Sequence, residues 1–217
     1  NNCINYYINQ DQYNNTLNNL KNQILSRNLT NNDSVENKII YTKNVDFQIS
    51  TLGDQLHNEN ISTISLKGCE SIIKQKYNIP DINSLIIIKV DTKNEKTNSI
   101  YVEYEVYHPY TLKKLNLDIC EKIDIIYPAN IDDNIKSLYN SLSDSGYNLF
   151  DENDSFYNDI CTPYTSQNST DIPMSDRGEL LNPVQNLSLC QSGCNYDHYN
   201  ASTNKITCNC NLNNNIT

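Results

Sequence analysis

The sequence predicts a mainly β protein: an immunoglobulin-like β-sandwich of about seven strands, followed by a helix and a disulfide-rich irregular tail. Between residues 36 and 128, apolar side chains recur with the period of two that is typical of half-buried strands. Turn-forming residues separate these runs at intervals that suit a sandwich. Five of the eight cysteines lie beyond residue 160, and beyond Pro163 the sequence has no strand or helix periodicity.

We divide the chain into an N-terminal helical segment (1–35), a β-sandwich domain (36–128) and a linking helix with a cysteine-rich tail (129–217). In the first part, four apolar residues fall on one face of a helix: Tyr13, Leu17, Leu20 and Ile24. Asparagine and lysine occupy the other face. We therefore expect an amphipathic helix that covers part of the sandwich.

The first three sandwich strands are expected at residues 38–42, 45–50 and 61–66. In the second of them, apolar and polar residues alternate strictly, which predicts a sheet with one face in water. Residues 69–77 are expected to form a short helix, which ends before Pro80 because the residue preceding a proline disfavours the α conformation.

Residues 84–91 form the most apolar run and are the expected central strand, with residues 100–108 as its hairpin partner. Glu103 and Glu105 indicate that one side of the second strand faces solvent. A short strand at 112–117 and a last one at 122–127 complete the sandwich.

A helix is predicted at residues 132–145, because Asp132 or Asp133 can cap its start and Gly146 can end it in the left-handed conformation. Beyond it, an acidic and aromatic junction leads into the tail. Few large apolar side chains follow Pro163, so we expect disulfides rather than a core to order the tail.

Cysteine parity is the sharpest inference about covalent structure. Three cysteines precede the junction and five follow, so complete pairing within the chain requires a bridge between the two parts. We predict Cys69–Cys120, Cys3–Cys161, Cys190–Cys208 and Cys194–Cys210, among ~105 possible connectivities. A zinc site at the last four cysteines, with His198 between them, is the rival interpretation, and its spacing departs from the usual one.

Nine asparagines begin N-glycosylation motifs: Asn14, Asn28, Asn32, Asn60, Asn153, Asn168, Asn186, Asn200 and Asn215. We expect the sites on polar loops to carry glycans and Asn153, among the aromatics of the junction, to be shielded. Together with the cysteines, these motifs predict an extracellular or cell-surface location.

Several classes are excluded or disfavoured. The net charge of −10 and scattered lysines argue against nucleic acid, and no apolar run is long enough for a membrane span. The start at Asn1 suggests a processed or excised part of a longer protein.

No catalytic motif is present, and the three histidines lie at unrelated places in the sequence: His57, His108 and His198. We therefore expect no enzyme and no cofactor. The pattern of Asp151, Asn153 and Ser155 is a weak calcium candidate, which we interpret instead as turn-capping side chains.

Several segments carry a resemblance to a known group of proteins: GCESIIKQKYNIP (68–80), SLIIIKVD (84–91), VEYEVYHP (102–109), LNLDIC (115–120), GYNLFDENDSFYNDICTPYTSQNSTDIPMSDR (146–177) and the tail motifs C-x3-C-x-Y and C-x-C. With these the chain resembles a module of uncharacterised surface proteins of protists, ciliates in particular. The resemblance covers about residues 60–210 and implies an extracellular ectodomain without an assigned activity.

These observations lead to one expectation and one alternative. We expect a non-enzymatic structural or adhesive module of a protist surface coat or filament, whose partners are other extracellular proteins or copies of itself, with N-linked glycans attached. The alternative is a carbohydrate-binding, lectin-like domain, because the sixteen tyrosines could supply platforms for sugar rings.

Overall fold

The protein is seen in a computed structural model, which describes residues 7–25, 35–57, 60–94, 99–129, 131–159, 164, 171–185 and 189–212. In these ranges the chain is mainly β, with two four-stranded antiparallel sheets and several helices. The elements are α1 (Gln10–Leu25), β1 (Lys38–Tyr41), β2 (Val45–Thr51), the 3-10 helix η1 (Asp54–His57), β3 (Thr63–Ser65), α2 (Cys69–Lys76), β4 (Ile86–Asn94), β5 (Ser99–Tyr107), β6 (Lys122–Pro128), α3 (Asp133–Asp144), α4 (Ser155–Asn158), α5 (Met174–Gln185), β7 (Cys194–Asn200) and β8 (Lys205–Asn211).

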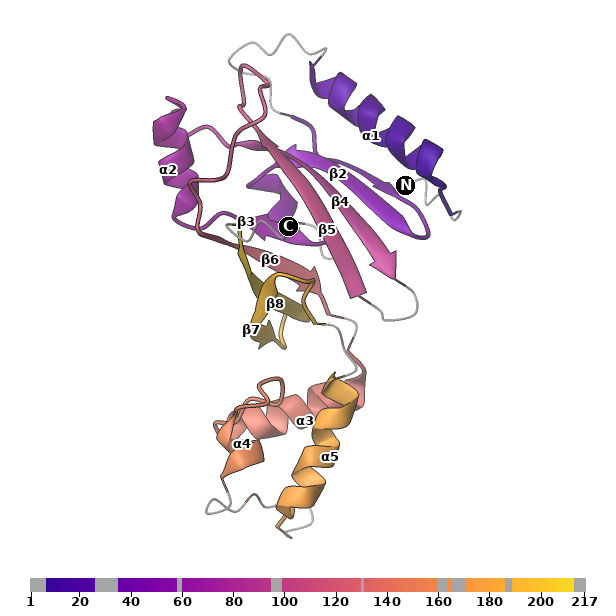
Figure 1. Ribbon diagram of the computed structural model, residues 1–217, viewed down its shortest axis with the longest axis vertical. Coiled ribbons are helices and arrows are strands. Elements are labelled where there is room, and N and C mark those ends of the chain that lie inside the picture. Colours follow the sequence, from indigo (N-terminus) through magenta and orange to yellow (C-terminus); the bar gives the residue numbers. More distant parts are fainter. Residues whose placement is uncertain are drawn as a thin grey trace.

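The first sheet has the strand order β1-β2-β4-β5 and the second β3-β6-β8-β7, with antiparallel pairing throughout. The predicted hairpin of β4 and β5 is confirmed by their continuous register from Ile86↔Tyr107 to Asn94↔Ser99. Figure 1 shows α1 lying along the first sheet, α2 at the opposite side, and α3, α4 and α5 grouped at the far end beyond β7 and β8.

The first sheet is covered on both faces. Phe47, Ile88 and Leu20 belong to a cluster between the sheet and α1, whereas Ile87 and Val106 belong to the larger cluster shared with the second sheet. The N-terminal amphipathic helix is therefore confirmed as a cover of the sheet. It also lies over the side of β5 that was expected to face solvent, because Lys21 of α1 contacts Glu105 at 2.7 Å.

The expected strand at 112–117 is wrong. Leu112 has φ +56°, a left-handed conformation that interrupts an extended run, and the segment pairs with β5 through an isolated β-bridge, Tyr107↔Lys114, instead of a continuous ladder. The helix predicted at 132–145 is confirmed as α3: Asp132 accepts hydrogen bonds from the backbone N–H groups of Asn134 and Ile135, and Gly146 follows with φ +84°.

The expectation that the tail lacks periodic structure is also wrong. α5 and two strands lie there, and β8 pairs with β6 on one side and β7 on the other. Ile206, Cys208 and Cys210 alternate inward on β8 and are all buried. The pattern I-x-C-x-C is thus a strand alternation whose inward cysteines form disulfides, and the second sheet contains strands from both sides of residue 128.

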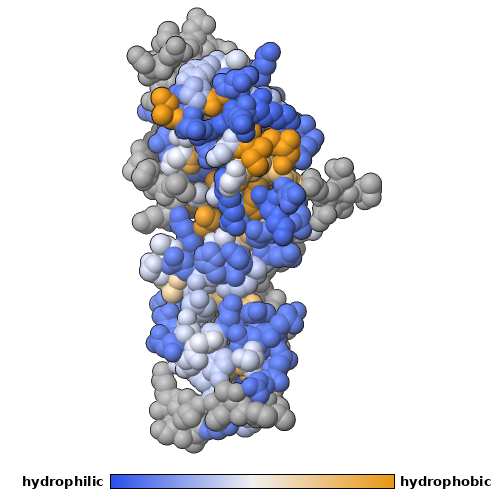
Figure 2. All heavy atoms as spheres, turned by 90° about the vertical axis from the view of Figure 1, so that its left-hand side faces the viewer, coloured by the Kyte–Doolittle hydropathy of each residue, from blue (hydrophilic) through white to orange (hydrophobic). Residues whose placement is uncertain are grey.

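The face around α2 is mainly hydrophilic, with small separate apolar patches in its upper half (Figure 2). Two large aliphatic side chains are exposed among the described residues: Ile72 on α2 and Ile82 in the turn that follows it. Scattered exposed apolar residues of this kind are normal on the surface of a folded protein and need no functional explanation.

Candidate functional site

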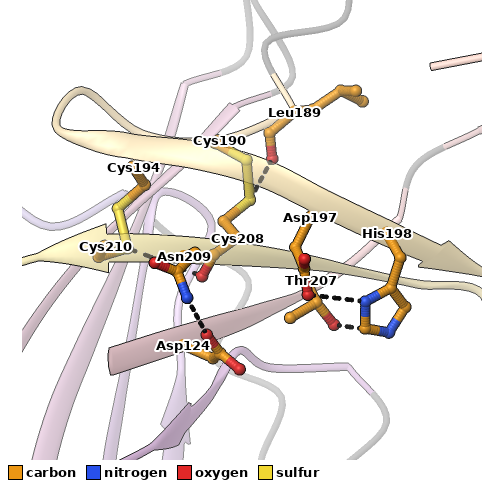
Figure 3. Close-up of a disulfide and its surroundings, with 10 residues drawn as sticks. All are labelled: Asp124, Leu189, Cys190, Cys194, Asp197, His198, Thr207, Cys208, Asn209 and Cys210. Atoms are coloured by element: carbon orange, nitrogen blue, oxygen red, sulfur yellow. Dashed lines mark hydrogen bonds and ion pairs between the residues drawn. A yellow bond between two sulfur atoms is a disulfide. The ribbon is translucent and has the colours of Figure 1, made fainter. Parts of the chain in front are cut away.

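Three disulfides are present in the described part of the chain, and they are the pairs predicted there: Cys69–Cys120, Cys190–Cys208 and Cys194–Cys210. The last two attach the segment before β7, and the start of β7 itself, to neighbouring inward positions of β8 (Figure 3). Cys3 and Cys161 lie outside the described residues, so their bridge stays a prediction.

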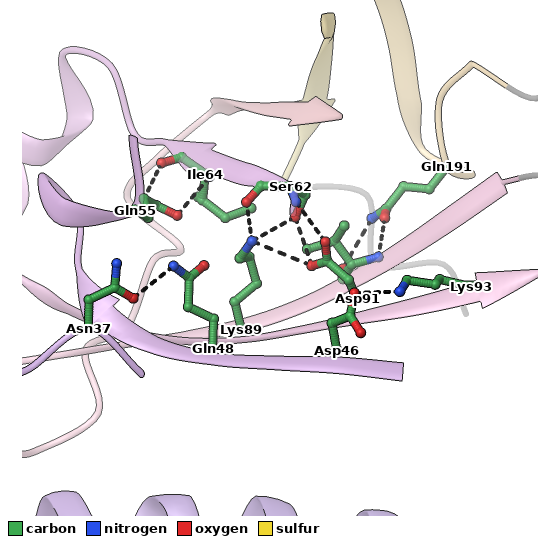
Figure 4. Close-up of polar contacts among 11 residues, drawn as sticks. Asn37, Asp46, Gln48, Gln55, Ser62, Ile64, Lys89, Asp91, Lys93 and Gln191 are labelled. Atoms are coloured by element: carbon green, nitrogen blue, oxygen red, sulfur yellow. Dashed lines mark hydrogen bonds and ion pairs between the residues drawn. The ribbon is translucent and has the colours of Figure 1, made fainter. Parts of the chain in front are cut away.

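Gln191, between these two disulfides, caps the edge of the first sheet. The backbone N–H of Val102 on β5 donates to its Oε1 at 2.7 Å, and its Nε2 donates to the carbonyl of Val102 at 3.5 Å (Figure 4). A side-chain amide here takes the place of a neighbouring strand. The disulfides position Gln191 because they hold the loop that carries it.

Gln55 does the same at the edge of the second sheet. Its Nε2 donates to the carbonyl of Ile64 on β3 at 2.7 Å, and the N–H of Ile64 donates to its Oε1 at 3.0 Å. Gln55 is fully buried. Edge strands with free N–H and C=O groups invite pairing with other chains, so both caps protect against association.

A polar seam lies between the sheets, where a wet face was expected on β2. Asp46, Gln48 and Ser50 are each no more than 1% exposed, because the second sheet covers this face. Lys89 of β4 lies opposite Gln48 and is fully buried. The sequence alternation was correct, but it separates two interior faces rather than an interior and a wet one.

Lys89 is the centre of this seam (Figure 4). Its Nζ donates to the carbonyl and the hydroxyl of Ser62 and lies 3.5 Å from Oδ1 of Asp91. Asp91 in turn accepts from the N–H of Ser62 at 2.7 Å and from its hydroxyl at 2.8 Å. The ammonium and carboxylate are thus saturated, which makes them a cross-link between β4 and the start of β3.

Burial changes the ionisation of the seam. It lowers the pKa of Lys89 to about 8, although the charge of Asp91 opposes the shift. It also raises the pKa of Asp46 above its usual range, in spite of an ion pair with Lys93 at 2.6 Å. Both groups hold their charge at a cost that only their partners offset.

A groove runs along the edge of β5. One hollow of about 190 Å³ lies between α1 and β5, where the Tyr13 hydroxyl donates a hydrogen bond to Oε2 of Glu103 at 2.7 Å. A second hollow of about 500 Å³ lies beyond β5 and is lined by Val106, Leu115 and Leu117. Tyr104, Glu105 and Lys114 line both hollows, and the ion pair of Glu105 with Lys114 at 2.7 Å lies between them.

His198 is on β7 and not in a loop. A bulge between Tyr196 and His198 places His198 beside Asp197, with Nδ1 3.0 Å from the carboxylate and Nε2 3.4 Å from the Thr207 hydroxyl (Figure 3). The order Asp, His, Thr is that of a nucleophile relay, but the imidazole is 59% exposed and Thr207 is buried under it. We interpret the three as a link between β7 and β8.

Arg177 locks the group of helices together. It is 3% exposed, its Nε donates to the carbonyl of Ile172 at 2.9 Å, and its guanidinium lies 5.4 Å from the centre of the Phe156 ring. Around it the junction aromatics pack on one another, as in the pair Phe156–Tyr164. One of only two arginines in the chain thus joins α5 to α4, which the sequence did not reveal.

The junction carboxylates cap turns, as we interpreted them. Asp154 accepts from the N–H of Phe156 at 2.8 Å and from that of Asn148 at 3.0 Å, while Asp151 accepts from the N–H of Asn153 at 2.9 Å. Their oxygens are directed to the backbone. Within the described ranges, no group of three or more acidic, histidine or cysteine side chains could hold a metal ion.

Four of the glycosylation motifs lie in the described residues, at Asn14, Asn60, Asn153 and Asn200, and all four asparagines are exposed. The expected shielding of Asn153 is therefore wrong, because this asparagine is exposed. The other five lie outside the described residues: Asn28, Asn32, Asn168, Asn186 and Asn215. Among the residues that the structure describes, no helix is long and apolar enough to cross a membrane.

Comparison with known proteins adds little. No family model matches the chain, and no solved structure matches it. One curated protein is similar, the Disease resistance-like protein DSC1 of Arabidopsis thaliana, with 29% identity over 124 residues. That match covers 50% of this chain and only 10% of the plant protein. The chain thus spans about a tenth of the length of the relative that it matches. A match of this extent does not assign the chain to a family.

Proposed function

We propose that the chain is a non-enzymatic structural or adhesive module that works outside the cell, N-glycosylated and stabilised by disulfides. The observation that carries this is the tail: two disulfides hold β8 and the Gln191 loop, and disulfides persist in oxidising compartments. The four described glycosylation motifs support it, because all of their asparagines are accessible to a transferase.

As part of this proposal we take the two sheets to be an immunoglobulin-like sandwich. The chain passes from the first sheet after β2 to β3 in the second, returns for β4 and β5, and crosses again to β6. Repeated crossing between two antiparallel sheets with a shared core is typical of that fold. Such a module would belong to a protist surface coat or filament, in keeping with the resemblance of the sequence.

A protein contact is favoured over the lectin alternative by the packing of the tyrosines. Tyr139, Tyr147 and Tyr199 pack edge-on or tilted against other aromatic rings inside the molecule, so they are poorly placed to serve as platforms for sugar rings. Adhesion through protein surfaces is therefore the function that we propose.

The test is the state of the native protein. Surface proteolysis of intact cells should release the chain, and its mass should fall after treatment with a glycosidase and rise after reduction and alkylation. A chain protected inside intact cells, with no mass change from the glycosidase, would overturn the proposal.

A further inference from the structure

We propose that the β5 groove binds an extended peptide of a partner protein as an added strand, with an apolar residue at the centre and a basic residue beside it. This inference rests on the proposed function and deepens it, because it names the chemistry of the partner that an adhesive module would hold. It follows from the backbone of Tyr104 and from what surrounds it.

The first step is the direction of the backbone groups on β5. Val102 directs its N–H and C=O away from β4, to Gln191, and Val106 directs its carbonyl the same way, to the N–H of Leu115 at 2.8 Å. In an antiparallel ladder this direction repeats at every second residue. Tyr104 lies between the two, so its N–H and C=O also point outward.

The second step is that this pair of groups is left open. Within the part of the chain that the structure describes, neither the Gln191 loop nor the 112–118 segment forms a hydrogen bond with the backbone of Tyr104. Both hollows of the groove meet at this residue. The edge is therefore capped on both sides of an opening one residue wide.

The third step is the pattern of side chains that the opening would accept. A partner residue that exchanges both backbone bonds with Tyr104 has its own side chain on the same face as the Tyr104 ring. That face leads to the larger hollow, with Val106, Leu115 and Leu117. An apolar side chain such as valine or leucine fits there.

The residues next to it on the partner point to the opposite face, where Glu103 lies. Glu103 is exposed and receives one hydrogen bond, from the hydroxyl of Tyr13, whereas Glu105 already contacts Lys21, Lys114 and Tyr107. A lysine or arginine is the complement of Glu103. The net charge of −10 disfavours a second copy of this chain as the partner.

The experiment uses the full chain and a capped five-residue peptide with lysine-valine-lysine at its centre, titrated while backbone amide signals are recorded by NMR. We expect the amide of Tyr104 to shift and to gain protection from hydrogen exchange. Glu103→Lys should weaken this peptide about fivefold, the effect of one exposed ion pair, and should strengthen binding of the matched peptide with glutamate-valine-glutamate. The control Glu121→Lys changes an exposed glutamate outside the groove and should do neither.

Leu117→Lys provides a second test of the proposal. It places a charged side chain in the larger hollow and leaves the backbone of β5 unchanged, so we expect it to abolish binding of the peptide. The inference is overturned if the peptide leaves the Tyr104 amide unchanged, if the charge exchange does not follow the peptide, or if only soluble oligosaccharides shift the groove signals. A negative result for peptide binding would not contradict the proposal of an extracellular module, because that proposal is tested separately by surface proteolysis and glycosidase treatment.

Discussion

The side-chain amide of Gln191 forms hydrogen bonds with both the backbone N–H and the backbone C=O of Val102, 89 residues away in the sequence. This pair joins the tail to the edge of the first sheet, and its position depends on two disulfides. Gln55 and Ile64 repeat the arrangement at the edge of the second sheet. A glutamine side chain thus caps part of one edge strand in each sheet, β5 in the first and β3 in the second.

Replacing Gln191 by alanine should leave two backbone groups of Val102 without partners. We expect a loss of about 1–2 kcal/mol in the free energy of unfolding, the effect of two hydrogen bonds partly replaced by water, and faster amide exchange at Val102. Urea unfolding and hydrogen exchange measure both. Gln75→Ala, at an exposed position of α2, is the control and should change neither.

Lys89→Met should be strongly destabilising, by about 3–5 kcal/mol, because it leaves the buried Asp91 without its cation. Lys89→Met combined with Asp91→Asn should recover part of the loss. Lys122→Met, at an exposed position, is the matched control. Equal stabilities of the wild-type protein and the single variant would contradict the role of the seam.

The pH dependence of the same group has a defined sign. The pKa of Lys89 is lowered to about 8 by burial, so between pH 8 and about 10.4 the unfolded chain binds more protons than the folded one. The contribution of Lys89 therefore raises stability with pH in this window. We expect the difference between wild type and Lys89→Met to grow from pH 8 to 9.5 in urea unfolding, and a constant difference would refute it.

Glu105 contributes to the pH dependence of stability at acid pH. Burial opposes its ionisation, but hydrogen bonds from Lys114, Lys21 and Tyr107 outweigh it and lower its pKa to about 2. Its contribution is complete above the unfolded pKa of about 4.3 and is lost as the pH falls toward 2. Glu105→Gln should flatten the decline of stability between pH 5 and 2, whereas Glu121→Gln should retain the wild-type slope.

Reduction should affect the tail unevenly. The Cys190–Cys208 and Cys194–Cys210 loops span 18 and 16 residues, which corresponds to about 3 kcal/mol each. We expect the Gln191 loop and β7 to exchange faster after reduction, while β8 keeps protection close to that of β6 because it lies inside the second sheet. Simultaneous loss of protection in β7 and β8 would contradict this expectation, because it would show that β8 also needs the disulfides to stay folded.

Much of the local structure was predictable because neighbouring residues determine it. The period of α1, the cap of α3 at Asp132 and the apolar run of β4 depend on side chains within a few positions of one another. The two cysteine pairs of the tail were also predicted correctly, as a ladder of nearly equal sequence separations.

Only the tertiary structure decided what lies against each face. The alternation of β2 is visible in the sequence, but whether Asp46 and Gln48 meet water or a second sheet depends on strands most of which lie more than 70 residues away. The place of β8 between β6 and β7, and the clamp of Gln191 on Val102, have the same origin. Hydrogen bonds and ion pairs with distant residues stabilise a buried polar side chain, as Lys93 does for Asp46, and the sequence pattern near such a side chain carries no record of those partners.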